Sequence, residues 1–274
     1  MEDKILNNIR IDTNVFKNGS IGGIQNITKI HGLDSAYEIW DEANRTILNS
    51  NGNNEILNQG FLSLKRAFNV TSIELKKHLA IDKIGYDTKK SKKDFLGDLE
   101  YFEIIKTLTL NKYLKIRNLI EHENHKPPSI EDCLSLSEYI WNYIRNTANI
   151  LNQFMELIIF SDYEDNNRIV FEYKTEKKGK EYFPHLYITS LLQSHLISFL
   201  KIDDSINVEN IKLLNKFDVS NNIEFEKKCY SMGELNVIAF SGEILNQEVI
   251  SMYIKHLILP EFGGLDEESI KSIF

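Results

Sequence analysis

The chain has 274 residues, of which 42% are hydrophobic and 26% charged, and its formal net charge is −8 at pH 7. This is the composition of a globular protein, and no uninterrupted apolar run approaches the roughly 18 to 20 residues that a membrane helix needs. The acidic balance argues against a protein that coats nucleic acid non-specifically, because such binding rests on many Lys and Arg contacts to phosphate. The polar N-terminal segment lacks a secretory pattern, so we expect a cytoplasmic protein.

The charge is uneven along the chain. Residues 1–162 hold 20 basic and 22 acidic groups, and residues 163–274 hold 12 basic and 18 acidic groups. We therefore expect RNA to bind to residues 1–162, where the net charge is less negative. The two cysteines, Cys133 and Cys229, stand far apart and have no partners at metal-ligand spacing, which predicts buried thiols and neither a disulfide nor a zinc site.

The first two thirds of the chain have the pattern of helices joined by short connections. Residues 33–48 place apolar side chains at spacings of three and four, which predicts an amphipathic helix. A second helix is expected over residues 55–68. The TSIE sequence at residues 71–74 has the form of a capping box and predicts a new, shorter helix that ends near Leu79.

A loop and two further helices complete this part. Residues 82–94 are rich in Gly, Lys and Asp and predict an exposed loop, whose lysines are either solvated or in contact with phosphate. A long third helix is expected over residues 95–121 and must end before Pro127 and Pro128. Ser129 then caps a fourth helix that continues to about Phe160. Four main helices with short turns predict an up-and-down bundle.

The pattern of residue types changes after residue 163. Residues 168–175 and 182–189 are β-branched and aromatic and are joined by a KKGK turn, which predicts a β-hairpin. Residues 208–217 resemble a helix, residues 235–240 a strand, and residues 242–259 a helix. We therefore expect a mainly α protein with two domains, a helical bundle over 1–163 and a smaller mixed α/β domain of unknown role over 164–274.

Polar groups that can do chemistry concentrate at the end of the third predicted helix, in the sequence RNLIEH. Arg117 and Glu121 lie about 40° apart around an ideal helix, as do Asn118 and His122, whereas Arg117 and His122 lie about 140° apart. Arg117 and His122 can therefore converge only if the helix is distorted near its end or if a partner molecule completes the site. The remaining histidines have no carboxylate or cysteine neighbours at ligand spacing, and residues 19–23 (GSIGG) lack the Lys-Ser/Thr of a phosphate loop, so neither a metal nor a cofactor is assigned.

An Arg-Asn pair followed by three residues and a His, at the end of a bundle helix and before a Pro-containing turn, resembles the motif of the HEPN family. The resemblance covers a little over half of the chain. It implies a metal-independent endoribonuclease, usually a homodimer in which two Arg/His pairs face a shared cleft. Arg117 and His122 would then be catalytic and Asn118 and Glu121 supporting residues.

The chemistry of these residue types suits RNA cleavage. An imidazole can take the proton of an attacking ribose 2′-hydroxyl or protonate the departing 5′-oxygen, and a guanidinium can bind the phosphate on which charge builds up. A structural role is the alternative, because His near a helix C-terminus and an Arg-Glu pair at i,i+4 are favourable in themselves. Tyr139, Trp141 and Tyr143 could stack bases or could belong to the core or a dimer interface.

The function expected from the sequence is therefore a cytoplasmic endoribonuclease of HEPN type, acting in toxin-antitoxin systems or antiphage defence. Its partners would be an RNA substrate, a second copy of the chain, and an antitoxin or regulatory protein. The C-terminal region would serve regulation or recognition. The rival interpretation is a non-catalytic, HEPN-like dimeric module that binds RNA, nucleotide or a partner protein.

Overall fold

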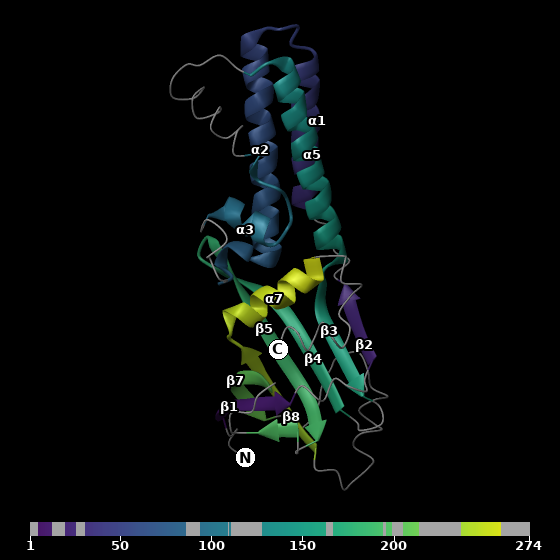
Figure 1. Ribbon diagram of the computed structural model, residues 1–274, viewed down its shortest axis with the longest axis vertical. Helices are drawn as coiled ribbons and strands as arrows, with labels where there is room; N and C mark the ends of the chain where they lie inside the picture. Colours follow the sequence, from purple (N-terminus) through teal and green to yellow (C-terminus); the bar gives the residue numbers. More distant parts are fainter. Residues whose placement is uncertain are drawn as a thin grey trace. The chain divides into compact units, whose positions relative to one another are not determined.

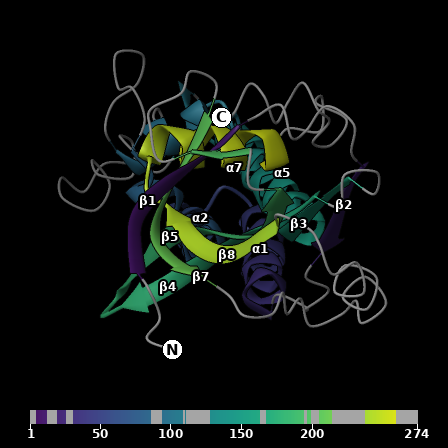
Figure 2. The same ribbon diagram turned by 90° about the horizontal axis from the view of Figure 1, so that it is seen from below.

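The protein is described here by a computed structural model, which defines residues 5–12, 20–25, 31–85, 94–108, 110, 128–162, 167–193, 196–198, 205–213 and 237–258. The fold is mixed α/β, with helices that pack together and a curled antiparallel sheet (Figures 1 and 2). The chain divides into two compact units. The helical unit comprises residues 27–83 and 87–154, and the sheet unit comprises residues 1–26, 84–86 and 155–274.

The helical unit is built on three long helices that contact one another. Buried apolar side chains from all three face inward, among them Ile47, Phe61 and Tyr143. Asn53 caps the second long helix by accepting from the backbone of Glu55 and Ile56. The elements are α1 (His31–Leu48), α2 (Asn54–Leu79), a short 3₁₀ turn (Ile81–Lys83), α3 (Phe95–Tyr101) and α5 (Ile130–Gln153).

Two of the predicted helix boundaries are confirmed. The predicted helix over 33–48 is α1, which begins two residues earlier and ends at the same residue. Ser129 is the N-cap of α5, where its hydroxyl oxygen accepts from the backbone N–H of Asp132 at 3.1 Å.

The predicted capping box in TSIE is wrong, because α2 runs through it without a break. The hydroxyls of Thr71 and Ser72 are buried and donate to the carbonyls of Ala67 and Phe68, one turn earlier in the same helix. A Ser or Thr hydroxyl can cap a new helix or can donate to the carbonyl four residues earlier in an existing one. Here burial against neighbouring helices favours the second arrangement.

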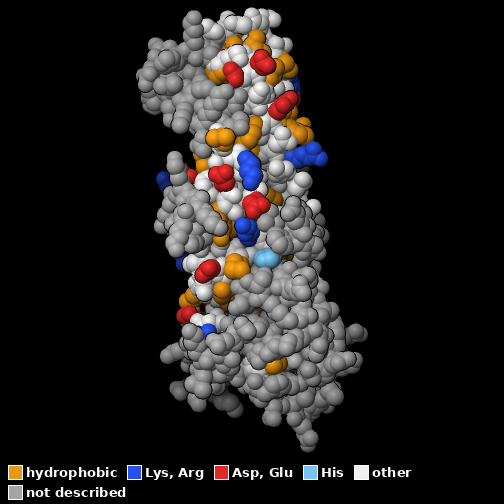
Figure 3. Space-filling view, viewed as in Figure 1, with side chains coloured by type: hydrophobic (Ala, Val, Ile, Leu, Met, Phe, Trp, Pro, Cys, Tyr) orange, Lys and Arg blue, Asp and Glu red, His pale blue; other side chains and the backbone are white. Residues whose placement is uncertain are grey.

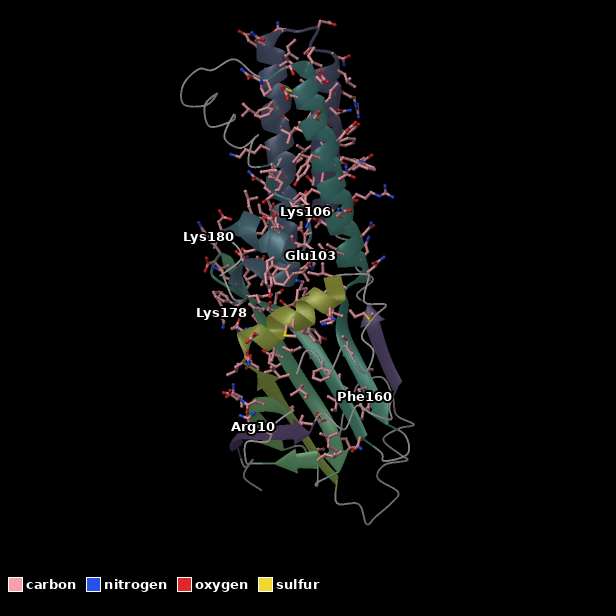
Figure 4. All side chains as sticks on the ribbon, in the orientation of Figure 1. Arg10, Glu103, Lys106, Phe160, Lys178 and Lys180 are labelled. Atoms are coloured by element: carbon pink, nitrogen blue, oxygen red, sulfur yellow. The ribbon has the colours of Figure 1, made fainter. Side chains whose placement is uncertain are left out.

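The predicted continuous helix over 95–121 is also wrong, because α3 ends at Tyr101. Glu103 adopts a left-handed φ of 56°, and the N–H of Ile104 returns to the carbonyl of Leu99 at 2.9 Å. This is the hydrogen-bond pattern that terminates helices, with Glu103 in the position usually held by glycine. Figure 4 labels Glu103 and Lys106 in the segment that follows. The Thr107 hydroxyl donates to the Glu100 carboxylate at 2.9 Å and holds this turn.

The sheet unit is an antiparallel sheet in the order β2-β3-β4-β5-β8-β7-β1-β6. Figure 2 shows the curl of the strands within this unit. The predicted hairpin is confirmed, since β4 and β5 pair from Arg168↔Leu191 to Lys178↔Glu181. The elements are β1 (Ile5–Asp12), β2 (Ser20–Gln25), β3 (Met155–Asp162), β4 (Asn167–Lys178), β5 (Glu181–Gln193), β6 (Ile197–Ser198), β7 (Ser205–Leu213), β8 (Val237–Ile244) and α7 (Gln247–Ile258).

The fourth helix ends earlier than predicted. The chain leaves the helical conformation at Phe154, and residues that were expected to be helical to Phe160 form β3. β3 pairs with β2 on one side and β4 on the other. The sequence assigned residues 1–163 to the bundle, whereas β1, β2 and β3 lie in the sheet unit. The helical unit is therefore inserted between two paired strands.

A strand also replaces the helix expected over residues 208–217 as far as Leu213, where the described part of this stretch ends. Val208 and Ile211 are three residues apart, which is a helical spacing, and both are fully buried. In β7 a bulge between Glu209 and Lys212 shifts the register against β8 by one residue. A bulge interrupts the alternation of side chains, so two inward residues can stand at i and i+3.

One face of the sheet forms the core of this unit together with α7. Phe171 and Tyr173 of β4 point to this face, and their rings lie 6.3 and 6.5 Å from the ring of Tyr253 on α7. Figure 4 labels Phe160 of β3, which is also buried. The amphipathic pattern of α7 and the alternation of β4 explain this packing. None of the helices in the described ranges is both long and apolar enough to cross a bilayer.

Candidate functional site in the sheet unit

The predicted catalytic pair, Arg117 and His122, lies outside the described residues, as do the supporting residues Asn118 and Glu121. All four belong to the segment 111–127, which joins the part of the chain after α3 to the start of α5. The prediction for these residues stays a prediction.

The three aromatic residues of α5 have separate roles. Tyr143 is fully buried, its hydroxyl lies 3.1 Å from Ser72 Oγ, and its ring packs 4.9 Å from Phe68, so it is a core residue. The Tyr139 hydroxyl donates to the carbonyl of Lys106. Burial and the charge of Glu100 raise the pKa of Tyr139 to about 12.

Trp141 is only half-buried and belongs to an aromatic row on α1 and α5. Its ring lies 6.5 Å from that of Trp40, which lies 5.3 Å from Tyr37. The guanidinium of Arg145 stands 5.2 Å from the Trp141 ring. The indole N–H of Trp40 donates to the carbonyl of Ser137 at 2.8 Å and so fixes α1 to α5.

A pocket of about 380 Å³ lies on the face of the sheet opposite to α7. It is lined from four adjacent strands, and its polar lining contrasts with the apolar core on the other face. The lining residues are Glu172 and Lys174 of β4, Tyr187, Ile188 and Thr189 of β5, Asn210 of β7, and Ser241, Gly242 and Glu243 of β8.

The register places three carboxylates in one cross-strand row, and two of them, Glu172 and Glu243, line the pocket. Glu172 pairs with Tyr187, Tyr187 with Glu243, and Glu243 with Glu209. Like charges directly opposite one another destabilise a sheet by a few tenths of a kcal/mol to about 1 kcal/mol. Glu243 and Glu209 are the directly opposed pair, and each of them accepts a hydrogen bond from a neighbouring side chain, Glu243 from His185 and Asn210 and Glu209 from Asn207.

Glu243 is held by two side chains from neighbouring strands. His185 Nδ1 lies 2.6 Å from Glu243 Oε1, and since a carboxylate can only accept, the ring donates. Asn210 Nδ2 donates to the other oxygen at 3.4 Å. Only 17% of the His185 and Glu243 side chains is exposed. These bonds fix the position of one pocket carboxylate.

Tyr187 forms the aromatic part of the lining. Its ring stacks on that of His185 with a centroid distance of 5.8 Å, and its hydroxyl donates to Glu176 Oε1 at 2.8 Å. Burial, the hydrogen bond to Glu176 and nearby carboxylates raise the pKa of Tyr187 to about 12. The same hydrogen bond, with the charge of His185, lowers the pKa of Glu176. Tyr187 therefore stays neutral near neutral pH and Glu176 stays charged.

The pocket wall between β7 and β8 depends on two unusual backbone positions. Asn210 adopts a left-handed φ of 53° at the bulge, a conformation that asparagine tolerates better than most residues. A Cβ at Gly242 would stand 2.4 Å from Val208 Cγ1 and 2.9 Å from the carbonyl oxygen of Glu209. Both features bring β7 close to β8 beside Glu243.

The arrangement can bind charged or polar groups through carboxylates, hydroxyls and one ammonium. Among the described residues, no group of three or more His, Cys, Asp or Glu side chains is placed to hold a metal ion. Comparison of the chain with protein-family models, curated proteins and solved structures gave no match.

The sequence carried a signal for this pocket that our sequence interpretation did not use. Glu172 and Lys174 alternate with the buried Phe171 and Tyr173 on β4, and His185 and Tyr187 alternate with the buried Leu186 and Ile188 on β5. Such alternation predicts a polar sheet face. The presence of a His, a Tyr and several carboxylates together indicates a binding surface, in contrast to an ordinary solvent-exposed sheet face.

Proposed function

We propose that this chain is a metal-independent endoribonuclease that cleaves RNA through Arg117 and His122. The observation that carries the proposal is the RNLIEH sequence and its resemblance to the HEPN motif. The described helices α1, α2 and α5 are compatible with the four- or five-helix bundle of that family. Ser129 caps α5, the helix that follows Pro127 and Pro128 in the sequence.

In the proposed reaction His122 exchanges protons with the ribose 2′-hydroxyl or the departing 5′-oxygen, and Arg117 binds the phosphate. Asn118 positions His122 or the substrate, and Glu121 orients Arg117. The chain acts in the cytoplasm, in a toxin-antitoxin system or in antiphage defence, where an antitoxin or another regulatory protein would control it. This setting rests on the family resemblance alone.

The proposal includes a homodimer, and the row of Tyr37, Trp40 and Trp141 with Arg145 is a suitable contact. Tyr, Trp and Arg are the residue types that dominate protein interfaces, and Tyr37 is 49% exposed. We expect Trp141→Ala to shift the chain toward monomer in sedimentation equilibrium. An unchanged mass across the concentration range would place the dimer contact elsewhere.

The test is cleavage of total RNA and of tRNA by the purified full chain in EDTA. We expect wild-type activity to survive chelation and both His122→Ala and Arg117→Ala to abolish it. Arg66→Ala is the matched control, because Arg66 is an exposed residue of α2. Equal cleavage by wild type and both motif variants would refute the proposal.

The non-catalytic module is the second candidate, and the charge distribution favours it. The net charge is −8. On the face drawn in Figure 3, acidic and basic side chains are interspersed along the helical unit rather than separated into a basic stripe. Phosphate binding by such a surface is weak. Retention of RNA without cleavage, in an electrophoretic shift assay, would support this candidate.

A further inference from the structure

We propose that the tip of the β4–β5 hairpin binds single-stranded RNA, with a base stacked on Tyr182 and phosphates paired with Lys177 and Lys180. The hairpin belongs to the sheet unit, so this contact is separate from the proposed catalytic pair. It rests on the proposed function only in taking RNA rather than DNA as the nucleic acid. Residues 176–181 at the tip are all exposed, and Figure 4 labels Lys178 and Lys180 there.

The tip concentrates positive charge in an acidic protein. The net charge of the chain is −8, yet residues 174–180 hold four lysines and one glutamate. Lys174 is paired with Glu172. In the part of the chain that the structure describes, no carboxylate forms an ion pair with Lys177 or Lys180. These two ammonium groups are therefore available to a polyanion, and lysine contacts to phosphate supply much of the affinity for nucleic acid.

The alternation of side chains separates Lys177 from the carboxylates of the tip. Lys177 and Tyr182 are cross-strand partners, so their side chains share one face of the hairpin. Glu176 and Glu181 each stand one residue before them and therefore point to the other face, where Glu176 accepts a hydrogen bond from Tyr187. Along β4 and β5 the face of Lys177 and Tyr182 therefore carries no carboxylate.

Tyr182 supplies a surface on which a base can stack. The side chain is half-buried, and Lys177 Nζ lies 5.9 Å from the centre of its ring. The Tyr187 hydroxyl on the same strand is bonded to Glu176, whereas that of Tyr182 has no hydrogen-bond partner among the described residues. A ring beside an ammonium matches a nucleotide, in which a base adjoins a phosphate. Unpaired bases commonly bind by stacking on aromatic side chains.

The loop of the hairpin favours a nucleic acid over a membrane surface. Cross-strand pairing continues to Lys178↔Glu181, so Gly179 and Lys180 form a two-residue loop. Gly179 has a φ of 68°, which such loops require at their first position. A Cβ added there would meet no atom within 4 Å, so the loop is open to solvent. Glycine and lysine offer no apolar side chain that could insert between lipids.

The test is the binding of fluorescein-labelled oligo(U), about 12 nucleotides long, to the full chain, measured by fluorescence anisotropy at several salt concentrations. All variants carry His122→Ala as background, so that a nuclease does not consume the probe. Tyr182→Ala should weaken binding about fivefold or more, whereas Tyr182→Phe keeps the ring and should retain binding. Lys177→Gln and Lys180→Gln should each lower the slope of log affinity against log salt by about 0.7.

Two substitutions on the other face of the hairpin are the matched controls. Lys178 Nζ lies 5.5 Å from the centre of the Phe183 ring, so this face also has an ammonium beside a ring. Lys178→Gln and Phe183→Ala should each cause a smaller loss than the matching change at Lys177 or Tyr182. The proposal is overturned if oligo(U) does not bind, if Tyr182→Ala binds as tightly as the background chain, or if the controls lose as much affinity. Binding of phosphatidylserine vesicles in place of oligo(U) would also overturn it.

The outcome also separates this contact from RNA cleavage. If oligo(U) binding depends on Tyr182 while wild type, Arg117→Ala and His122→Ala cleave RNA equally, the hairpin contact stands and the nuclease proposal fails. If Arg117→Ala abolishes cleavage while Tyr182→Ala leaves binding unchanged, the nuclease proposal stands and the hairpin contact fails.

Discussion

Replacement of Gly60 by alanine tests the packing of α1 against α2. A Cβ at this position would stand 2.5 Å from Ile47 Cγ1 and 3.2 Å from the carbonyl oxygen of Ala43. Alanine is more favourable than glycine inside a helix by about 1 kcal/mol. Overpacking of a filled core costs about 1 to 3 kcal/mol, and the 2.5 Å approach to Ile47 Cγ1 places this site in the upper half of that range. We therefore expect Gly60→Ala to lower the free energy of unfolding by about 1 to 2 kcal/mol.

The same substitution should change sign when the obstruction is removed. Ile47→Ala alone leaves a cavity and costs about 2 to 5 kcal/mol. In that background the Cβ of Gly60→Ala fits the vacated space, and we expect a gain of about 1 kcal/mol from helix propensity. The double-mutant cycle should thus show a coupling of about 2 to 3 kcal/mol.

Tryptophan fluorescence during urea unfolding measures this effect selectively. The chain has two tryptophans, Trp40 and Trp141, and both belong to the helical unit. The transition that they report is therefore that of α1 and α5, whatever the sheet unit does. A stabilised Gly60→Ala single variant, or equal effects of Gly60→Ala in both backgrounds, would refute the close approach of α1 and α2 at this residue.

Three further predictions concern buried groups. Tyr143→Phe removes the hydroxyl that lies 3.1 Å from Ser72 and should cost about 1 kcal/mol in the same fluorescence assay, whereas no loss would mean that the bond contributes nothing. Burial raises the pKa of Cys133 to about 11, so roughly one thiol in a thousand is ionised at about pH 8, and peptide mapping should find it unmodified by iodoacetamide until the helical unit unfolds. Gly242→Ala should push β7 from β8 at Val208 and lower the melting temperature of the sheet, followed by circular dichroism in the β-sheet region; an unchanged melting temperature would contradict the close approach of the two strands at this residue.

Much of the helical unit could be predicted from the sequence, because local signals and packing agree there. The apolar period of residues 33–48 and the Ser129 cap each specify one outcome, and both are confirmed. The TSIE sequence shows where local signals are insufficient. Its hydroxyls can cap a new helix or bond back within an existing one, and the choice depends on the surrounding helices.

Two segments that were predicted as helices are strands in the structure, and the reason differs from that for the TSIE sequence. Val208 and Ile211 follow a helical spacing because a bulge, formed by pairing with β8, shifts the alternation. Residues 155–160 continue the apolar run of α5 but become β3 because β2 and β4 supply partners. Strand pairing depends on segments that are distant in the sequence, so it cannot be predicted from a local residue pattern.

The sheet pocket could be predicted only in part, for the same reason. The alternation of Glu172 and Lys174 on β4, and of His185 and Tyr187 on β5, shows that one face is polar. The sequence does not show that Glu243, more than fifty residues later, stands beside them. That neighbourhood follows from the pairing of β5 with β8.

The order of the elements has a consequence for any experiment that separates the two units. β2 and β3 are paired neighbours, and Gln25 stands opposite Met155 where the chain leaves the sheet and where it returns. Both ends of the helical unit therefore start from adjacent points of one sheet. A fragment cut at residue 163 would carry β3 without β4 and would expose an unpaired edge, which promotes aggregation. Inactivity of that fragment would not count against Arg117 and His122, so the nuclease assay requires the full chain.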